Sequence, residues 1–211
     1  MCSFCFPIVF LLMLFLHMLS LIQSRLKSSA DLKNKIAADQ TLCKSIEILA
    51  ERMLLTYQNN RKILWCGNGG SAADAQHLAA ELSGRYYKDR PPLNSEALHV
   101  NTSYLTAVAN DYGYQFVFSR MVEAIGQKGD LLIGLSTSGN SENIIEALQH
   151  AKSKGLYTAA FTGAGGGRLS FIADLCIAIP SKDTPRIQEC HMLIGHSLCE
   201  YLEQCLFDPR S

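Results

Sequence analysis

The sequence predicts an α/β fold, a three-layer αβα sandwich with a five-stranded parallel sheet. Five short apolar runs have the length of strands and lie at 62–66, 97–101, 130–136, 157–162 and 174–179. Apolar residues at helical spacing mark the stretches around them, at 41–57, 71–85, 140–154 and 184–206. Strands that alternate with helices form parallel sheets with both faces covered, and such sheets bind ligands at the carboxyl ends of their strands.

The composition is that of a globular protein without a strong electrostatic field. The chain has 211 residues, of which 48% are hydrophobic and 18% are charged, enough for one domain with a large core. Lysine and arginine together number 19, as do aspartate and glutamate. This balance argues against nucleic acid as a partner, and it means that an anionic ligand must be held by local groups.

Residues 6–21 form an almost entirely apolar run near the length of a membrane span. Pro7 and His17 interrupt it, no Lys or Arg precedes it, and no small-residue cleavage site follows, so a signal peptide is disfavoured. From Met18 onward the apolar residues follow helical spacing instead. We favour residues 1–17 as an N-terminal extension, from a misassigned translation start, ahead of one domain at 18–207. A membrane anchor is the alternative.

The eight cysteines are scattered along the chain, and several, such as Cys66, lie within apolar periodic runs. Small buried thiols are typical of a reducing compartment. The pair Cys2 and Cys5 has redox spacing but lacks the strand and helix that surround a redox motif. We therefore expect a cytoplasmic protein, or a membrane-anchored one if the apolar start is an anchor.

A glycine loop, residues 67–71, follows the first predicted strand with the sequence Gly-Asn-Gly-Gly-Ser and leads into a helix. Glycines let the backbone approach a ligand closely, and a helix N-terminus offers free N–H groups. The loop has neither the Walker pattern nor the order of dinucleotide-binding glycines. Alone, it is equally well explained as an ordinary glycine turn.

A serine loop, residues 136–141, follows the strand at 130–136 and reads Ser-Thr-Ser-Gly-Asn-Ser. Its four hydroxyl groups surround one glycine at the start of a helix, which suits a phosphate dianion bound without a counter-charge. An ordinary helix N-cap would account for one of these hydroxyls but not for four. The loop therefore predicts a phosphate site.

Two pairs of polar residues lie on predicted helices. His77 and Glu81 are four residues apart, so they share a helix face and could bind one cation or act as a catalytic pair. An isolated pair at this spacing is also common as a surface ion pair. Gln188 and His196, on the last helix, are about 80° apart around its axis. Spacing alone does not bring the two helices together.

Four segments, GNGGSAADAQHLAAELSGR, NDYG, LSTSGNSENIIEAL and RIQECHMLIGH, resemble the sedoheptulose 7-phosphate isomerases (phosphoheptose isomerases) of the sugar isomerase (SIS) domain superfamily. The similarity extends from about residue 18 to residue 207. It implies a SIS domain with a flavodoxin-like five-stranded sheet after N-terminal helices, and a homotetramer with active sites at subunit interfaces. It also implies conversion of sedoheptulose 7-phosphate to D-glycero-D-manno-heptose 7-phosphate, a step in bacterial heptose synthesis for surface polysaccharide.

The resemblance assigns roles to individual residues. It implies that the substrate's sugar contacts Asn68, Gly69, Gly70, Ser71, Glu81, Asn110, Asp111 and Gln188. It implies that the phosphate contacts Ser136, Thr137, Ser138 and Ser141. One Zn²⁺ per subunit would be bound by His77, Glu81, Gln188 and His196, and the catalytic acid–base pair would be Glu81 and His196.

The implied chemistry fits these residue types. Moving a carbonyl between C1 and C2 requires a base at carbon and a proton shuttle at oxygen, here Glu81 and His196, with zinc polarising the carbonyl. The alternative is a non-catalytic SIS protein of the replication-initiator-binding type, which lacks an acid at position 81 and a histidine at position 196. A sugar-phosphate-sensing regulator would carry an added DNA-binding region, and none is evident.

Overall fold

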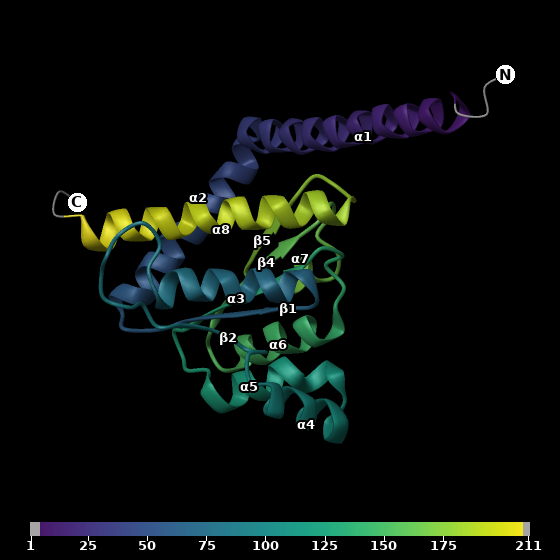
Figure 1. The fold of residues 1–211 in the computed structure, drawn as a ribbon. Coiled ribbons are helices and arrows are strands. Elements are labelled where there is room, and N and C mark those ends of the chain that lie inside the picture. The colour runs from purple at the N-terminus through teal and green to yellow at the C-terminus, as the bar shows by residue number, and fades with distance from the viewer. Residues whose placement is uncertain (1–4, 209–211) are drawn as a thin grey trace.

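The computed structural model describes the backbone of residues 5–208 and the side chains of residue 13 and residues 17–208. At its centre is a parallel sheet in the order β2-β1-β3-β4-β5 (Figure 1). The strands are β1 (Ile63–Gly67), β2 (Ser95–Ala97), β3 (Leu131–Ser136), β4 (Tyr157–Thr162) and β5 (Leu175–Ala178). The predicted α/β fold with five parallel strands is confirmed.

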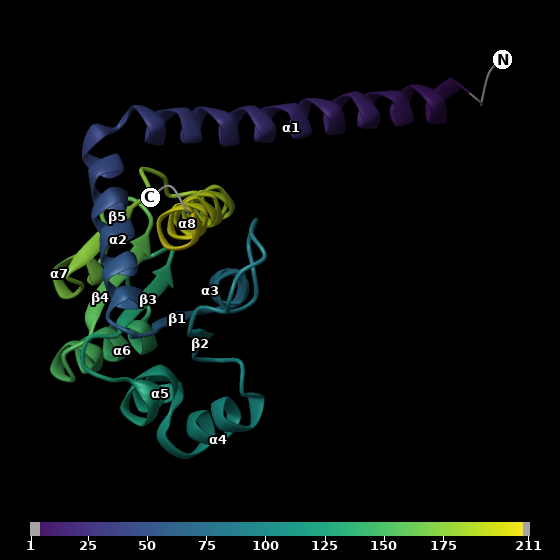
Figure 2. The ribbon, with the colours of Figure 1, turned by 90° about the vertical axis from the view of Figure 1, so that its left-hand side faces the viewer.

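Helices cover both faces of the sheet. One layer contains α2 (Gln40–Gln58), α3 (Gly70–Ser83) and α8 (Thr184–Phe207), and the opposite layer contains α4 (Thr102–Tyr112), α5 (Val117–Ile125), α6 (Glu142–Ser153) and the short α7 (Leu169–Ile172) (Figure 2). Successive strand residues point to opposite faces, so Trp65 packs in the first core and its neighbour Leu64 in the second. Both side chains are fully buried.

The second strand lies earlier than predicted. The expected run 97–101 is wrong, because pairing with β1 begins at Ser95 opposite Ile63 and ends at Ala97 opposite Trp65. The chain then turns, and the Asn101 side chain accepts a hydrogen bond from the Tyr104 N–H as the N-cap of α4. Neither α4 nor α5, nor the 3₁₀ turn between them at Tyr114–Phe116, was predicted from the sequence.

The first helix, α1 (Cys5–Ala38), projects away from the sandwich, and its C-terminal part contacts α2 and α8 (Figures 1 and 2). It continues through position 18 without a break, so the predicted boundary between residues 17 and 18 is not marked by the backbone. Residues 1–4 of the predicted extension lie outside the described residues. Within the part of the chain that is described, no helix combines the length and apolarity needed to cross a membrane.

The strand order determines where a ligand can bind. In the order 2-1-3-4-5 the chain reverses direction across the sheet between β1 and β3, and doubly wound folds bind ligands at that reversal, beyond the carboxyl ends of the strands. The glycine loop follows β1 and the serine loop follows β3. Both predicted loops therefore flank this position.

Candidate active site

The glycine loop and the helix that follows the serine loop are tied together by side-chain amides. Asn68 Nδ2 donates to Asn143 Oδ1, and Asn143 Nδ2 donates back to Asn68 Oδ1, each at 2.9 Å. The hydroxyl of Tyr114 donates to the same Asn68 oxygen at 3.1 Å. Sequence reasoning included Asn68 but missed Asn143 and Tyr114, because Asn143 follows the serine loop, on α6, and Tyr114 lies outside the quoted segments. This network holds the two sides of the reversal point at a fixed separation.

Gly70 brings the last helix against the glycine loop. A Cβ atom at this position would lie 2.6 Å from Gln188 Nε2, so a larger residue there would displace the Gln188 side chain. Ser71 follows as the second residue of α3 and is buried. Two predicted site residues from distant parts of the chain, Gly70 and Gln188, are therefore in contact.

The serine loop has its hydroxyl groups turned toward one another. Ser136 Oγ lies 2.8 Å from Ser141 Oγ and 3.4 Å from Ser138 Oγ, and the Asn140 N–H donates to Ser138 Oγ at 3.1 Å. Ser141 is the N-cap residue of α6, yet its side chain makes no capping hydrogen bond. The N-cap alternative is therefore not observed, and the cluster of hydroxyls lies beside a helix N-terminus, whose free N–H groups favour an anion.

A second glycine loop, residues 163–167 after β4, supports the serine loop and was not predicted. Gly139 has a φ of +68°, and a Cβ atom there would lie 2.1 Å from the carbonyl oxygen of Gly166. The Leu169 N–H donates to the Gly139 carbonyl at 3.0 Å. Any larger residue at position 139 would separate the two loops.

His77, Glu81 and His196 converge between α3 and α8; we call them the His–Glu cluster. His77 Nε2 lies 2.9 Å from Glu81 Oε1 and 3.3 Å from His196 Nε2. One ligand atom from each residue lies within 4.8 Å of the other two. The packing of α3 against α8 thus supplies the proximity that sequence spacing could not predict.

The donor set of the His–Glu cluster suits a divalent transition metal. Two imidazoles and one carboxylate are the protein ligands of many catalytic zinc sites, with a further position left for water or substrate. A Zn–N bond of about 2.0–2.1 Å at a tetrahedral angle separates two ligand atoms by roughly 3.3 Å. The His77 and His196 nitrogens have this separation. Three of the four predicted metal ligands are therefore placed to hold one ion.

A cleft of about 560 Å³ opens beside the His–Glu cluster and includes the fourth predicted ligand, Gln188, with His196. Lys33 of α1 and Asp74 of α3 also line it, and neither was predicted. The Oδ2 atom of Asp74 is buried without a hydrogen-bond partner, and burial raises the pKa of this carboxyl above its ordinary value while His77 partly opposes the rise. Sequence spacing could have indicated Asp74, because it lies one helical turn before His77.

The remaining predicted residues, Asn110 and Asp111, are hydrogen-bonded to each other. Asn110 and Asp111 lie exposed at the end of α4, where Asn110 Nδ2 donates to Asp111 Oδ1 at 2.8 Å. No hydrogen bond among the described residues joins either of them to the loops or to the His–Glu cluster.

Tyr86, which was not predicted, stacks on the His196 ring with centroids 5.5 Å apart. It therefore limits how the imidazole can rotate.

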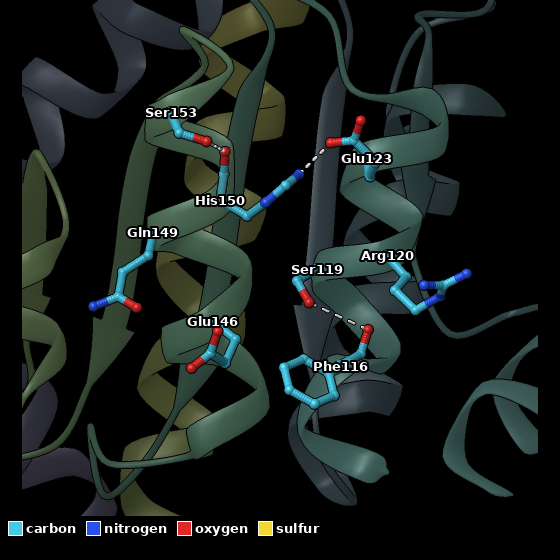
Figure 3. A pocket seen from close by; sticks show the side chains of 8 residues that line it. All are labelled: Phe116, Ser119, Arg120, Glu123, Glu146, Gln149, His150 and Ser153. Carbon is cyan, nitrogen blue, oxygen red and sulfur yellow. Dashed lines mark hydrogen bonds and ion pairs between the residues drawn. The ribbon is translucent and has the colours of Figure 1, made fainter. Parts of the chain in front are cut away.

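Another groove, of about 480 Å³, lies between α5 and α6 on the opposite layer (Figure 3). His150 and Glu123 point toward one another across it and form an ion pair, with Arg120 nearby on α5 (Figure 3). None of the predicted site residues lines this groove. The site indicated by the sequence is thus at the carboxyl edge of the sheet and not in this groove.

Comparison with known proteins agrees with the geometry at that edge. A family model described as "SIS domain" matches residues 26–163. Phosphoheptose isomerase from Aneurinibacillus thermoaerophilus is 52% identical over 186 residues, which cover 88% of this chain and 94% of that protein. The chain belongs to the phosphoheptose isomerase family.

Solved structures of this family have the same fold. Phosphoheptose isomerase from Neisseria gonorrhoeae superimposes with a TM-score of 0.83 at 40% identity, covering 89% of this chain and 99% of that one. The phosphoheptose isomerase from Francisella tularensis gives a TM-score of 0.84 at 36% identity, covering 88% of this chain and 98% of that one. The resemblance inferred from four sequence segments thus extends across the whole SIS domain.

Proposed function

We propose that the protein is an aldose–ketose isomerase that converts sedoheptulose 7-phosphate to D-glycero-D-manno-heptose 7-phosphate. The observation that carries the proposal is the convergence of Glu81 and His196, through His77, in a member of the phosphoheptose isomerase family. An isomerase of this kind needs a carboxylate and an imidazole at one reacting centre. A purely binding member of the superfamily needs neither.

The substrate would lie along the carboxyl edge of the sheet with its two ends in different subsites. Its phosphate is bound by the hydroxyls of Ser136, Thr137, Ser138 and Ser141. Those of Ser136, Ser138 and Ser141 cluster at the N-terminus of α6. Its sugar is bound by the glycine loop, Asn68 to Ser71, together with Gln188, which lies against Gly70. Asn110 and Asp111 would reach the sugar from the end of α4.

Proton transfer is the task of the His–Glu cluster. Glu81 removes the proton from one carbon and returns it to the neighbouring carbon, while His196 moves a proton between the two oxygens of the enediolate. Glu81 Oε1 lies against His77, which leaves the second carboxylate oxygen for the substrate proton. The stacked Tyr86 ring holds the His196 imidazole in position.

Zn²⁺, one per subunit, would be held by His77, Glu81, Gln188 and His196. When bound, it supplies a Lewis acid that polarises the substrate carbonyl. Two observations support this proposal: the His77 and His196 nitrogens have the separation of two ligands of a tetrahedral ion, and an oxygen of Glu81 lies within 4.8 Å of both.

A homotetramer in the cytoplasm is part of the proposal. Exposed apolar side chains of Met18, Leu19, Leu21, Ile22 and Leu26 lie along the projecting part of α1, and contiguous apolar surface of this kind is usually covered by a partner. The buried thiols of Cys66, Cys190 and Cys199 are compatible with a reducing compartment. The domain proposed for catalysis is 18–207; membrane contact would depend on residues 1–17.

The direct test is turnover with a defined substrate. The purified protein is incubated with sedoheptulose 7-phosphate, and the appearance of the aldose is followed by NMR, with and without a chelator and with Zn²⁺ added back. We expect the aldose to form, the chelator to suppress it and Zn²⁺ to restore it. Absence of the aldose in every condition would favour the non-catalytic binding protein instead.

A further inference from the structure

A cavity of about 310 Å³ continues from the serine loop toward the start of α8. Thr137 and Ser138 form one side of it, and Ser181, Lys182 and Thr184 form another. The family motifs that identified the serine loop do not include these last three residues. The cavity therefore adds a second wall to the proposed phosphate subsite.

Backbone hydrogen bonds fix the position of this second wall. The Gly163 N–H donates to the Thr137 carbonyl at 3.0 Å, and the Ala164 N–H donates to the Ser181 carbonyl at 2.9 Å. The ends of β3, β4 and β5 are thus linked in series, as expected for neighbouring parallel strands. The Asp183 N–H donates to Ser181 Oγ at 3.1 Å, which orders the turn that carries Lys182.

Lys182 is the one charged side chain among the residues that line this cavity. Its ammonium makes no hydrogen bond or ion pair with any described residue, whereas Lys33, Lys62 and Lys152 are all paired with carboxylates. The adjacent Asp183 is the N-cap of α8, makes no side-chain capping bond and does not line the cavity. A phosphate monoester carries a charge of about −1.5 to −2 at pH 7, and the serine loop supplies only neutral hydroxyls to meet it.

We propose that Lys182 is a specificity-determining residue whose ammonium binds the substrate's phosphate from the side opposite the serine loop. The inference rests on the proposed function for the identity of the sugar. The binding of a phosphate group by Lys182 does not depend on that function. An unpaired lysine that lines the same cavity as Thr137 and Ser138 favours a dianionic ligand group over a neutral one, because hydroxyl groups alone bind both. The lysine is exposed, so solvent weakens the interaction and the expected effect is about five- to tenfold in affinity.

The test compares Lys182→Met with Lys128→Met. Methionine keeps most of the aliphatic stem and removes the charge. Lys128 is an exposed lysine that forms no hydrogen bond or ion pair with any described residue. It lies at the opposite edge of the sheet, just before β3, so it is a matched control. Two quantities are measured for each variant: the KM and kcat for sedoheptulose 7-phosphate, and the dissociation constant of inorganic phosphate by ³¹P NMR titration.

For Lys182→Met we expect KM and the phosphate dissociation constant to rise about five- to tenfold, with kcat within twofold of the unsubstituted protein. Lys182→Arg should restore most of the affinity, and Lys128→Met should change neither quantity. Unchanged phosphate affinity in Lys182→Met would overturn the inference. If the protein binds phosphate but does not isomerise the sugar, the proposed function fails while the titration still decides the role of Lys182. If the unsubstituted protein binds no phosphate, the inference is overturned as well.

Discussion

Two groups of ionisable side chains lie between α3 and α8 and differ in exposure. In the His–Glu cluster, the side chain of His77 is 50% exposed and that of Glu81 is 22% exposed. In the second group, the Arg90–Glu203 ion pair, the two side chains are 1% and 2% exposed. Glu203 and His196 belong to the same helix, so one element carries both a solvent-accessible cluster and a buried one.

The buried pair has nearly complete hydrogen bonding. Glu203 accepts from the backbone N–H groups of Tyr86, Tyr87 and Lys88 and from Arg90 Nε, at 2.9–3.0 Å. Arg90 donates in turn to the carbonyls of Leu82 and Glu81, at 2.7 and 2.8 Å, at the end of α3. Burial alone would raise the pKa of Glu203, but these hydrogen bonds outweigh it and lower the pKa.

The difference in exposure indicates that the Arg90–Glu203 pair contributes to stability and that the His–Glu cluster is available for chemistry. A buried charge with all its hydrogen bonds satisfied holds the loop after α3 in place and has no capacity left for a ligand. The His–Glu cluster is open to solvent, and its three ligand atoms lie within 4.8 Å of one another. Substitutions in the Arg90–Glu203 pair should therefore change the free energy of unfolding, and substitutions in the His–Glu cluster should change turnover.

The largest effect is expected for Glu81→Gln. The amide cannot take a proton from carbon, so kcat should fall by about 100- to 10,000-fold, equivalent to roughly 3–5 kcal/mol, while the melting temperature stays nearly constant. Steady-state kinetics and thermal denaturation measure the two quantities. The matched control is Glu51→Gln, an exposed glutamate on α2, which should affect neither. Near-normal turnover in Glu81→Gln would remove Glu81 from the chemistry.

Glu203→Gln should have the opposite profile. Loss of the charge leaves Arg90 buried without its partner, so the free energy of unfolding should fall by about 3–5 kcal/mol, measured by urea denaturation. At low temperature the folded fraction should keep its kcat. Glu200→Gln, on the same helix but partly exposed, should cost less than about 0.5 kcal/mol. A loss of turnover without a loss of stability in Glu203→Gln would contradict the assignment.

A third ionisable group on α8, His191, predicts a pH dependence of stability. It is fully buried, its Nε2–H donates to the Thr162 carbonyl at 3.1 Å, and its Nδ1 has no partner. Burial lowers the pKa of His191 to about 4, although the hydrogen bond to Thr162 partly opposes this. As the pH falls, His191 therefore binds a proton in the unfolded chain before it does so in the folded protein. The free energy of unfolding that is present above about pH 6.5 is lost as the pH falls toward 4.

The contribution of His191 is measured against a variant. Between pH 7.5 and pH 4.5, His191 should lower the free energy of unfolding of the unsubstituted protein by on the order of 2 kcal/mol. His191→Leu should not show this loss, because leucine has no proton to bind. Urea denaturation at the two pH values gives this difference for each protein. If both proteins lose the same stability on acidification, His191 is not the responsible group.

The smallest predicted effect is at Tyr86, which connects the two groups. Its N–H is bonded to Glu203 while its ring stacks on His196. Tyr86→Leu keeps the backbone bond and removes the ring, so kcat should fall about tenfold with little change in stability. Tyr86→Phe should restore turnover, and the pH profile of kcat should shift in the leucine variant only. An unchanged pH profile and kcat in Tyr86→Leu would show that the ring does not position His196.

Much of the fold was predictable because its central strands are uniformly apolar. All residues of β1 and β3 are buried, and such runs stand out in a sequence. The edge strand β2 is only three residues long and contains Ser95 and Glu96, so its position depends on pairing with β1 and not on its composition. The residues of α4 and α5 mix polar and apolar positions over short lengths, and tertiary packing decides their conformation.

The candidate site was predictable in part. Helical spacing placed His77 beside Glu81, and the hydroxyl-rich loop indicated an anion site. The approach of His196 depends on how α3 packs against α8, which only the family resemblance supplied. Tyr86 and Lys182 were missed because each lies in an irregular segment whose position is set by backbone hydrogen bonds to distant residues. The assignment of individual substrate contacts stays a prediction.

The anchoring of α8 has a consequence for local motion. One face of the helix is buried along its length, at Ile187, Cys190, Ile194, Leu198 and Leu202, and Glu203 fixes its far end to the loop after α3. A segment held in this way opens only when the whole domain unfolds, and its amide hydrogens should exchange at the slowest rate in the molecule. Heating should therefore abolish activity and structure in a single transition, with no partly open form in which the sheet survives and the His–Glu cluster is lost.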